Sequence, residues 1–269
     1  MELLTTFRKK QISDLADYLS SEYSNSGATS LEKIILSENL PVHYDNYEDS
    51  FDGMLLYDGQ HFHIHINIDK GNRSDSRRGR FTLAHELGHY FIDEHRIGLM
   101  RGTLLPHPSQ HSVNNDSQIE AEADYFASCL LMPREKFRKQ SGHKEFSLGI
   151  LYNLSNFFQV SLLATVQRFA ELGTHEVMVV ISEENKVKRY IQSQDFPKWP
   201  FKFKVGQILP PTTVAGEFFS KINSKSTDIE DVSPDNWFYP KWRHSNMNMH
   251  EQCYYSDSYN YVISIIWFD

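Results

Sequence analysis

The feature that most constrains the fold of this chain is the pentapeptide HELGH at residues 85–89, inside an apolar run over residues 81–92. On an α-helix, residues four apart lie on one face about one turn apart, so the imidazoles of His85 and His89 can reach one metal ion. Glu86 projects about 100° from His85 around the helix, where its carboxylate can meet a water on the metal. The pattern therefore predicts a helix that carries half of a zinc site and a general base.

The helix predicted around this motif covers residues 79–94 and is apolar on both sides. Leu83, Leu87 and Phe91 form the face opposite the histidines, and a helix that is apolar all round belongs in the centre of a domain. Gly88 costs about 1 kcal/mol of helix stability relative to Ala, which favours a close approach of a neighbouring backbone at this position. Arg77, Arg78 and Arg80 are expected to form a solvated helix end.

A catalytic zinc needs three protein ligands and one open position, so a further ligand is required. A second buried helix is predicted over residues 117–132, where apolar residues recur at helical spacing. On a helical wheel Glu120 lies about 60° from the centre of the apolar stripe and Glu122 about 100° from it, which favours Glu120 as the ligand and leaves Glu122 as the lesser alternative. Asp124, one turn after Glu120, could accept a hydrogen bond from the other ring nitrogen of a ligating histidine.

His95 is a rival third ligand, because it stands six residues after His89 as in metzincins. In metzincins a glycine three residues after the second histidine lets the chain turn back, and here that position is Ile92. If the helix continues, His95 projects about 80° from the direction of His85 and lies more than two turns further along the axis. We therefore expect His95 to be out of reach of the metal.

The composition favours a globular cytoplasmic protein. Lys and Arg total 27 against 35 for Asp and Glu, and a net charge of −8 gives no global case for binding nucleic acid or an acidic membrane. The longest apolar runs, residues 177–181 and 261–268, are far shorter than the ~20 residues of a membrane helix. Two cysteines, Cys129 and Cys253, are too few for a secreted disulfide framework, so reduced thiols in the cytoplasm are expected.

The pattern along the chain predicts two domains. Residues 1–173 would hold a helical N-terminal part, a hairpin over residues 53–67 with Asp58-Gly59 at its turn, and the two buried helices. The alternating His61, His63 and His65 are expected on an exposed strand face, since neighbours on one face stand about 7 Å apart. The second strand could also pair with an extended substrate. Residues 174–269, rich in strand-like runs, would form a separate mixed α/β or mainly β domain of unknown role.

Residues 147–172 resemble a helix-turn-helix. Six basic and three acidic residues over 134–172 give a local charge of +3, which is weak support for DNA binding. Helical packing within the first domain is the favoured interpretation of this segment.

The two buried helices resemble a known family. A His-Glu-x-x-His helix after a short hairpin, followed at residues 120–133 by EAEADYFASCLLMP, is similar to the ImmA/IrrE family of zinc metallopeptidases, and the resemblance covers roughly residues 50–172. It implies an α+β chain whose zincin-like helical peptidase domain has a short antiparallel sheet. It also implies a gluzincin-like Zn²⁺ site with His85, His89 and Glu120 as ligands and Glu86 as the base.

The resemblance further implies a protein substrate, such as a helix-turn-helix transcriptional repressor. The expected reaction is peptide hydrolysis, with Tyr90, His107 and His111 as weak candidates for stabilising the oxyanion. The alternative hypothesis is a regulatory DNA- or protein-binding module in which the metal site is structural or inactive.

Overall fold

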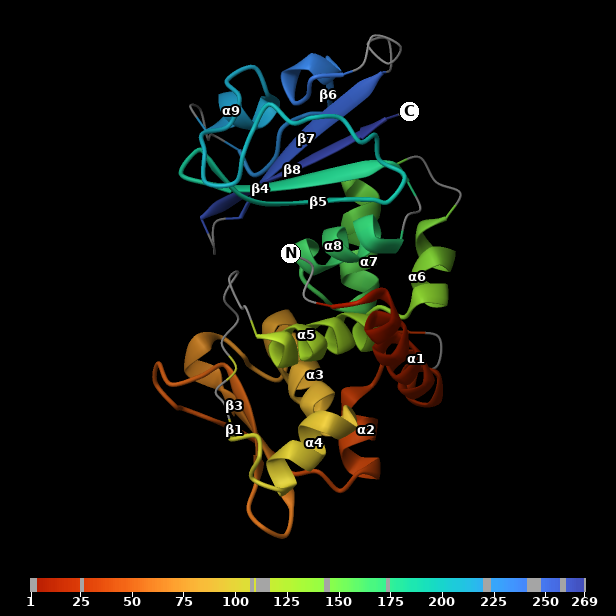
Figure 1. Cartoon of the computed structure of the whole chain (residues 1–269), viewed down its shortest axis with the longest axis vertical. Helices are drawn as coiled ribbons and strands as arrows, with labels where there is room; N and C mark the ends of the chain where they lie inside the picture. Colours follow the sequence, from red (N-terminus) through yellow and green to blue (C-terminus); the bar gives the residue numbers. More distant parts are fainter. Residues whose placement is uncertain are drawn as a thin grey trace. The chain divides into compact units, whose positions relative to one another are not determined.

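The computed structural model describes residues 4–24, 27–106, 109, 117–142, 146–172, 175–219, 224–240, 248–256 and 260–268. The chain divides into two compact units, Met1–Gln140 with Asn153–Leu162 (unit 1) and Ser141–Tyr152 with Leu163–Asp269 (unit 2). Unit 1 is mostly helical with a small sheet and unit 2 contains a larger sheet, so the fold is α+β as predicted (Figure 1). No helix in the described part of the chain is both long and apolar enough to cross a membrane.

The helices that precede residue 142 form most of unit 1. They are α1 (Thr6–Tyr23), α2 (Leu31–Ser37), α3 (Arg77–Phe91), α4 (Asp93–Met100), α5 (Gln118–Leu131) and α6 (Arg134–Ser141). Helix α3 packs against α5, and α1 packs on α5 as well (Figure 1). Ser76 caps α3, since its hydroxyl accepts a hydrogen bond from the Gly79 amide at 2.9 Å. The pentapeptide helix is therefore central to unit 1.

Unit 1 has one three-stranded sheet with the order β1-β3-β2, formed by β1 (Val42–Asp45), β2 (Gly53–Tyr57) and β3 (Phe62–Asn67). Strands β2 and β3 form the antiparallel hairpin expected around Asp58-Gly59, and a short 3₁₀ turn, η1 (Ile68–Lys70), follows β3. Strand β1 was not predicted, and because it runs parallel to β3 the sheet is mixed and not purely antiparallel. Strand β3 lies between its two neighbours, so the prediction that it pairs with a substrate is wrong.

Helices α7 (Leu148–Phe158) and α8 (Leu162–Leu172) occupy the segment predicted as helix-turn-helix-like, and their residues are divided between the units. The sheet of unit 2 has the order β5-β4-β8-β7-β6, and its paired strands are antiparallel. These strands are β4 (Val177–Glu183), β5 (Lys186–Gln192), β6 (Glu230–Val232), β7 (Met249–Ser256) and β8 (Tyr261–Phe268), with α9 (Val214–Phe218) and the 3₁₀ turn η2 (Pro234–Asn236) in the connections.

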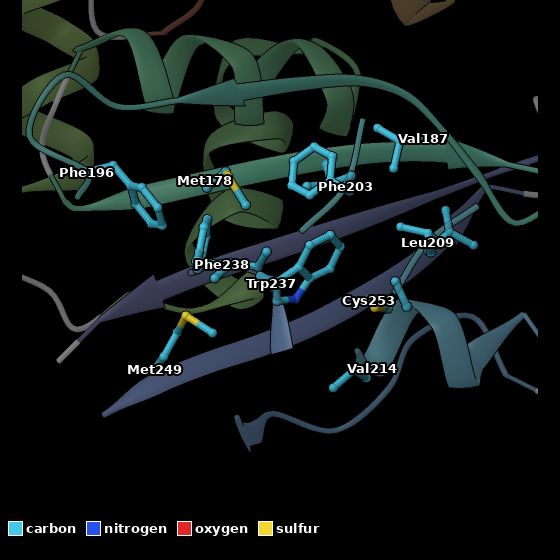
Figure 2. Packing of buried hydrophobic residues seen from close by; sticks show 14 of the residues in the cluster. Met178, Val187, Phe196, Phe203, Leu209, Val214, Trp237, Phe238, Met249 and Cys253 are labelled. Atoms are coloured by element: carbon cyan, nitrogen blue, oxygen red, sulfur yellow. The ribbon is translucent and has the colours of Figure 1, made fainter. Parts of the chain in front are cut away.

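An aromatic-rich core covers one face of the unit 2 sheet. Trp237 lies in the middle of this cluster, and Phe196, Phe203 and Phe238 pack around it (Figure 2). All four side chains are buried. The aromatic residues of this region are therefore used in the core, as expected for a globular domain.

Candidate active site and metal centre

Three side chains from α3 and α5 converge in unit 1. His85 and His89 lie one turn apart on α3, and their Nε2 atoms are 3.1 Å from each other. Glu120, in the first turn of α5, places its Oε2 3.3 Å from Nε2 of His85 and its Oε1 3.2 Å from Nε2 of His89. All three residues are buried. The structure thus brings together the three residues that the sequence nominated as ligands.

The spacing of these ligand atoms fits a zinc ion. Zinc binds histidine nitrogen and carboxylate oxygen at about 2.0–2.1 Å, so the edges of a tetrahedral site measure about 3.3 Å. The three observed distances of 3.1, 3.2 and 3.3 Å approach this edge length. Within the described residues, His85, His89 and Glu120 are the group of possible metal ligands that converges closely enough for one ion. Three ligands leave a fourth position open, as catalytic zinc requires.

The two histidines differ in their partners and in the direction of their pKa shifts. Nδ1 of His85 lies 2.8 Å from Oδ1 of Asp124, the partner nominated from the sequence, so the Nδ1 proton can be donated to this carboxylate while the Nε2 lone pair faces the ligand trio. Burial opposes the charged form of His85, but the carboxylates of Asp124 and Glu120 outweigh it and raise its pKa well above the usual value. Burial lowers the pKa of His89 to about 3, so this imidazole is neutral.

The proposed base, Glu86, is buried on α3 and lies against the first residue of β2. A Cβ atom on Gly53 would be only 2.6 Å from Oε1 of Glu86, so only a glycine leaves room for the carboxylate. Ser109 forms an antiparallel bridge with Gly53, and its hydroxyl lies 3.1 Å from Nε2 of His85. Sequence reasoning missed Gly53 and Ser109, although a glycine in a strand is a signal for close backbone approach.

Comparison with known proteins identifies the region that contains this site. Residues 54–170 match the model of a peptidase family, M78, described as the IrrE N-terminal-like domain. These residues belong to that family. The IrrE N-terminal-like domain of this chain contains the three candidate ligands, Glu86 and Asp124, and the resemblance expected from the sequence is confirmed. The comparison with curated proteins gives no match.

One solved structure shares the fold over almost the whole chain. It is a Mycobacterium tuberculosis transcriptional regulator that is 12% identical, with a TM-score of 0.58. The similarity covers 96% of this chain and 88% of the regulator. At this level of identity the likeness concerns the fold alone.

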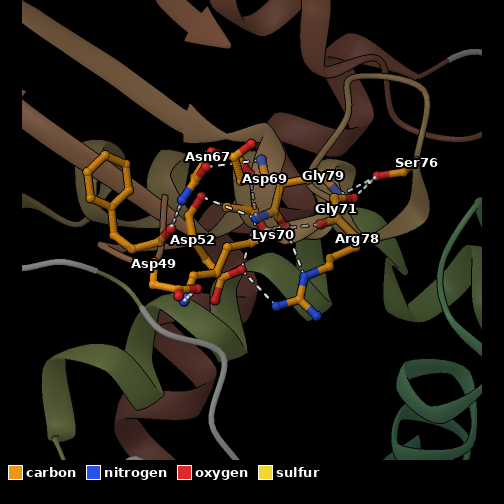
Figure 3. Close-up of polar contacts among 12 residues, drawn as sticks. Asp49, Asp52, Asn67, Asp69, Lys70, Gly71, Ser76, Arg78 and Gly79 are labelled. Carbon is orange, nitrogen blue, oxygen red and sulfur yellow. Dashed lines mark hydrogen bonds and ion pairs between the residues drawn. The ribbon is translucent and has the colours of Figure 1, made fainter. Parts of the chain in front are cut away.

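A buried polar network anchors β2 to the helix of the IrrE N-terminal-like domain (Figure 3). The carboxylate of Asp52 accepts hydrogen bonds from Asn72 at 2.9 Å and from the guanidinium of Arg78 at 2.7 Å. The Asn72 side chain also accepts a hydrogen bond from the hydroxyl of Thr82 at 2.9 Å. Because Asp52 precedes Gly53, this network positions the start of β2 beside Glu86. The prediction of a solvated helix end is therefore wrong for Arg78, which pairs with the buried Asp52.

The other two arginines of this helix end also make specific contacts. Arg77 donates to the Ser155 hydroxyl at 2.8 Å, and Arg80 donates to the carbonyl of Thr29. These contacts link α3 to other parts of unit 1. Arg77 remains exposed, as the prediction of a solvated helix end requires, whereas the prediction is wrong for Arg80, which is partly buried.

His95 and Glu122 lie close to the ligand trio but not in it. Helix α3 ends at Phe91, Ile92 is extended with φ of −75° and ψ of 109°, and α4 begins at Asp93. The chain therefore turns where a continuing helix was predicted, and His95 is buried behind His89, with 3.2 Å between their Nδ1 atoms. Glu122 is also buried, and its carboxylate contacts His95. Neither side chain belongs to the trio that converges on a common point.

The remaining nominated residues have other positions. The hydroxyl of Tyr90 donates to Glu38 at 3.1 Å, so it is engaged away from the ligand trio. His107 and His111 lie outside the described residues. On the predicted histidine face, His61 is exposed, whereas His63 contacts Asp58 at 2.8 Å and His65 contacts the hydroxyl of Tyr47 at 2.7 Å.

Proposed function

We propose that this chain is a zinc-dependent endopeptidase that cleaves a regulatory protein. The observation that carries the proposal is the convergence of three ligand atoms, 3.1 to 3.3 Å apart, with Glu86 directly after His85 on α3. Membership of residues 54–170 in a peptidase family supports it. The donor set of two imidazoles and one carboxylate is that of catalytic zinc sites with an open position.

His85, His89 and Glu120 would hold the ion. Bound zinc would supply a water with a pKa lowered toward ~7 and would polarise a peptide carbonyl. Glu86 accepts the proton of the attacking water and passes it to the leaving amine, as a general base and then a general acid. Asp124 keeps the Nδ1 proton of His85 in place, which leaves its Nε2 free to bind.

The edge of β2 supplies main-chain groups for an extended peptide. At Gly53 this edge pairs with Ser109: the Ser109 amide donates to the Gly53 carbonyl at 3.0 Å. A substrate strand that takes this place would pass directly over Glu86, because Gly53 has no side chain to separate them.

The regulatory nature of the substrate is the less direct part of the proposal. A protein described as a transcriptional regulator shares the fold, which supports a role in gene regulation, and a helix-turn-helix repressor is the substrate we propose. Both cysteines are buried and neither forms a disulfide within the described residues, which is consistent with the cytoplasmic location we propose.

Replacing Glu86 by Gln tests the activity. We expect Glu86→Gln to retain zinc, because no ligand changes, and to lose cleavage by about 10²–10⁴-fold, because the base is removed. The assay is co-expression with candidate repressors encoded near its gene, with immunoblots for fragments and metal analysis of the purified protein. Glu135→Gln, an exposed carboxylate on α6, is the matched control and should cleave normally.

Two outcomes would contradict the proposal. Equal amounts of fragment with Glu86→Gln and with the unchanged protein would exclude Glu86 as the base. A zinc-loaded protein that cleaves none of the candidates yet still alters their regulation would favour the alternative, a regulatory module with a structural metal site.

A further inference from the structure

A second set of buried polar residues stands behind His89, on the side away from the ligand trio. Nδ1 of His89 lies 3.2 Å from Nδ1 of His95, and Nε2 of His95 lies 3.2 Å from Oε2 of Glu122. His95 and Glu122 are only 3% and 4% exposed. Buried polar groups of this kind are costly unless they are paired, so the arrangement calls for a defined set of proton positions.

With a metal ion on the ligand trio, one assignment of protons satisfies both contacts behind His89. Nε2 of His89 must be unprotonated to bind a metal, so its Nδ1 carries the proton and donates it to Nδ1 of His95. His95 then carries its own proton on Nε2, which donates to the Glu122 carboxylate. Both hydrogen bonds therefore run in one direction, from the metal-binding ring to a buried carboxylate.

Arg8 of α1 holds that carboxylate. Its Nη2 atom lies 2.5 Å from Oε2 of Glu122, and the amide of Gln118 donates to the other oxygen, Oε1, at 3.0 Å. Both neighbours donate hydrogen bonds to this carboxylate and the guanidinium brings a positive charge, so Glu122 is held as an acceptor for His95. Arg8 also forms a two-pronged pair with Glu94 on α4 at 3.1 and 3.2 Å.

We propose that His95 and Glu122 are positioning residues for the metal ligand His89, and that Arg8 completes the relay from outside the family-matched region. The two histidine ligands of α3 are thus oriented by different hydrogen-bond partners. His85 contacts a carboxylate directly, on the half-exposed Asp124, whereas His89 reaches a buried carboxylate through a second imidazole. Arg8 belongs to α1, which lies before the family-matched residues 54–170, so this helix also supports the metal centre.

The inference rests on the proposed function in assuming that the site binds zinc, so the test measures zinc affinity and not cleavage. Metal-free protein is titrated with zinc against a chelator of known affinity. His95→Phe keeps a ring in the buried space but removes both polar contacts, and loss of such a partner is expected to weaken zinc binding by about 10–100-fold. His95→Asn, whose side-chain oxygen can accept the His89 proton, should recover part of this loss.

Glu122→Gln retains the shape of the side chain and removes its charge. It is therefore the variant to measure if His95→Phe does not fold. Its zinc affinity should fall by less than that of His95→Phe, since the amide can still accept from His95. Glu94→Gln is the matched control. Glu94 also pairs with Arg8, but its side chain is 67% exposed, so loss of its charge should change the zinc affinity by less than about threefold.

A second readout needs no metal. In the metal-free protein, Nδ1 of His89 faces His95 at 3.2 Å and its Nε2 faces the Glu120 carboxylate at 3.2 Å, so the two partners compete for the His89 proton. In ¹⁵N NMR spectra, the fraction of His89 protonated on Nδ1 should therefore be lower in His95→Phe than in the unchanged protein. Wild-type zinc affinity in both His95→Phe and Glu122→Gln, with an unchanged His89 tautomer, would overturn the relay. Failure of the unchanged protein to bind zinc would contradict the proposed function instead, while the tautomer measurement would still decide the relay.

Discussion

At the scale of single residues, the site depends on side chains that are small as much as on those that are reactive. A Cβ atom at position 53 would lie 2.6 Å from Oε1 of Glu86 and 2.7 Å from Cγ2 of Thr82, closer than real Cβ atoms approach. The Glu86 carboxylate therefore occupies space that is open only because residue 53 is glycine. The three ligands make no such contact with Gly53.

We expect Gly53→Ala to separate catalysis from metal binding. The added methyl group must displace Glu86, and a misplacement of about 1 Å can reduce kcat by about 10²-fold. Zinc content should stay unchanged. The measurement is kcat on a cleaved peptide together with metal analysis, and Gly27→Ala, where a Cβ would meet nothing within 4 Å, is the control. Normal kcat in Gly53→Ala would show that Glu86 tolerates the displacement.

At the scale of elements, the distance between α3 and α5 sets the geometry of the ligand trio, since α3 carries two ligands and α5 the third. A Cβ on Gly88 would be 3.1 Å from Cα and 3.2 Å from the carbonyl oxygen of Ala123 on α5. The close backbone approach expected from Gly88 is thus confirmed. This glycine lets the two helices come near enough for Glu120 to meet the histidines.

We expect Gly88→Val to push α3 and α5 apart. Overpacking of this kind lowers the free energy of unfolding by about 1–3 kcal/mol, and the zinc affinity should fall with it because Glu120 moves away from the histidines. Urea unfolding and zinc titration measure the two effects. Gly149→Val on α7, where the nearest atom to an added Cβ is Oγ of Ser147 at 3.5 Å, controls for the helix propensity of valine. Equal zinc affinity in both variants would contradict the spacing argument.

At the scale of the whole molecule, unit 2 has its own buried charge. Glu251 on β7 accepts hydrogen bonds from the Trp237 indole at 2.8 Å and from the Val214 and Ala215 amides, at 3.0 and 2.9 Å, at the start of α9. Burial outweighs these contacts and raises the pKa of Glu251 above its usual 4.5. The carboxylate ties three segments of unit 2 together, but its ionisation in the core is unfavourable.

The stability of unit 2 should therefore depend on pH through Glu251. Because the folded pKa is raised, the unfolded chain loses its proton first as the pH rises, so the stabilisation present below pH 4.5 is lost as the pH passes through the folded value. The free energy of unfolding relative to Glu251→Gln should be larger near pH 4.5 than at neutral pH. All four tryptophans, Trp199, Trp237, Trp242 and Trp267, follow residue 173, so their fluorescence reports on this unit. A difference that is constant with pH would refute the prediction.

Local patterns in the sequence determined much of unit 1. Helical spacing around the pentapeptide and around Glu120 predicted α3 and α5, and Asp58-Gly59 predicted the hairpin of β2 and β3. The same periodicity nominated the three ligands, because residues four apart on a helix share a face whatever surrounds them. The short strand β1 was not predicted, because its four residues carry too weak an alternating signal.

Only the tertiary structure decided which residues surround the ligands. The break at Ile92 brings His95 behind His89. The fold also brings together Arg8 and Glu122, which are 114 residues apart in the sequence. It also places Gly53 and Ser109 at the site. These neighbours are distant in sequence and meet through the packing of helices and strands. Helical and strand periods describe only which face a residue occupies, and the identity of the element that covers that face is set by the folded core.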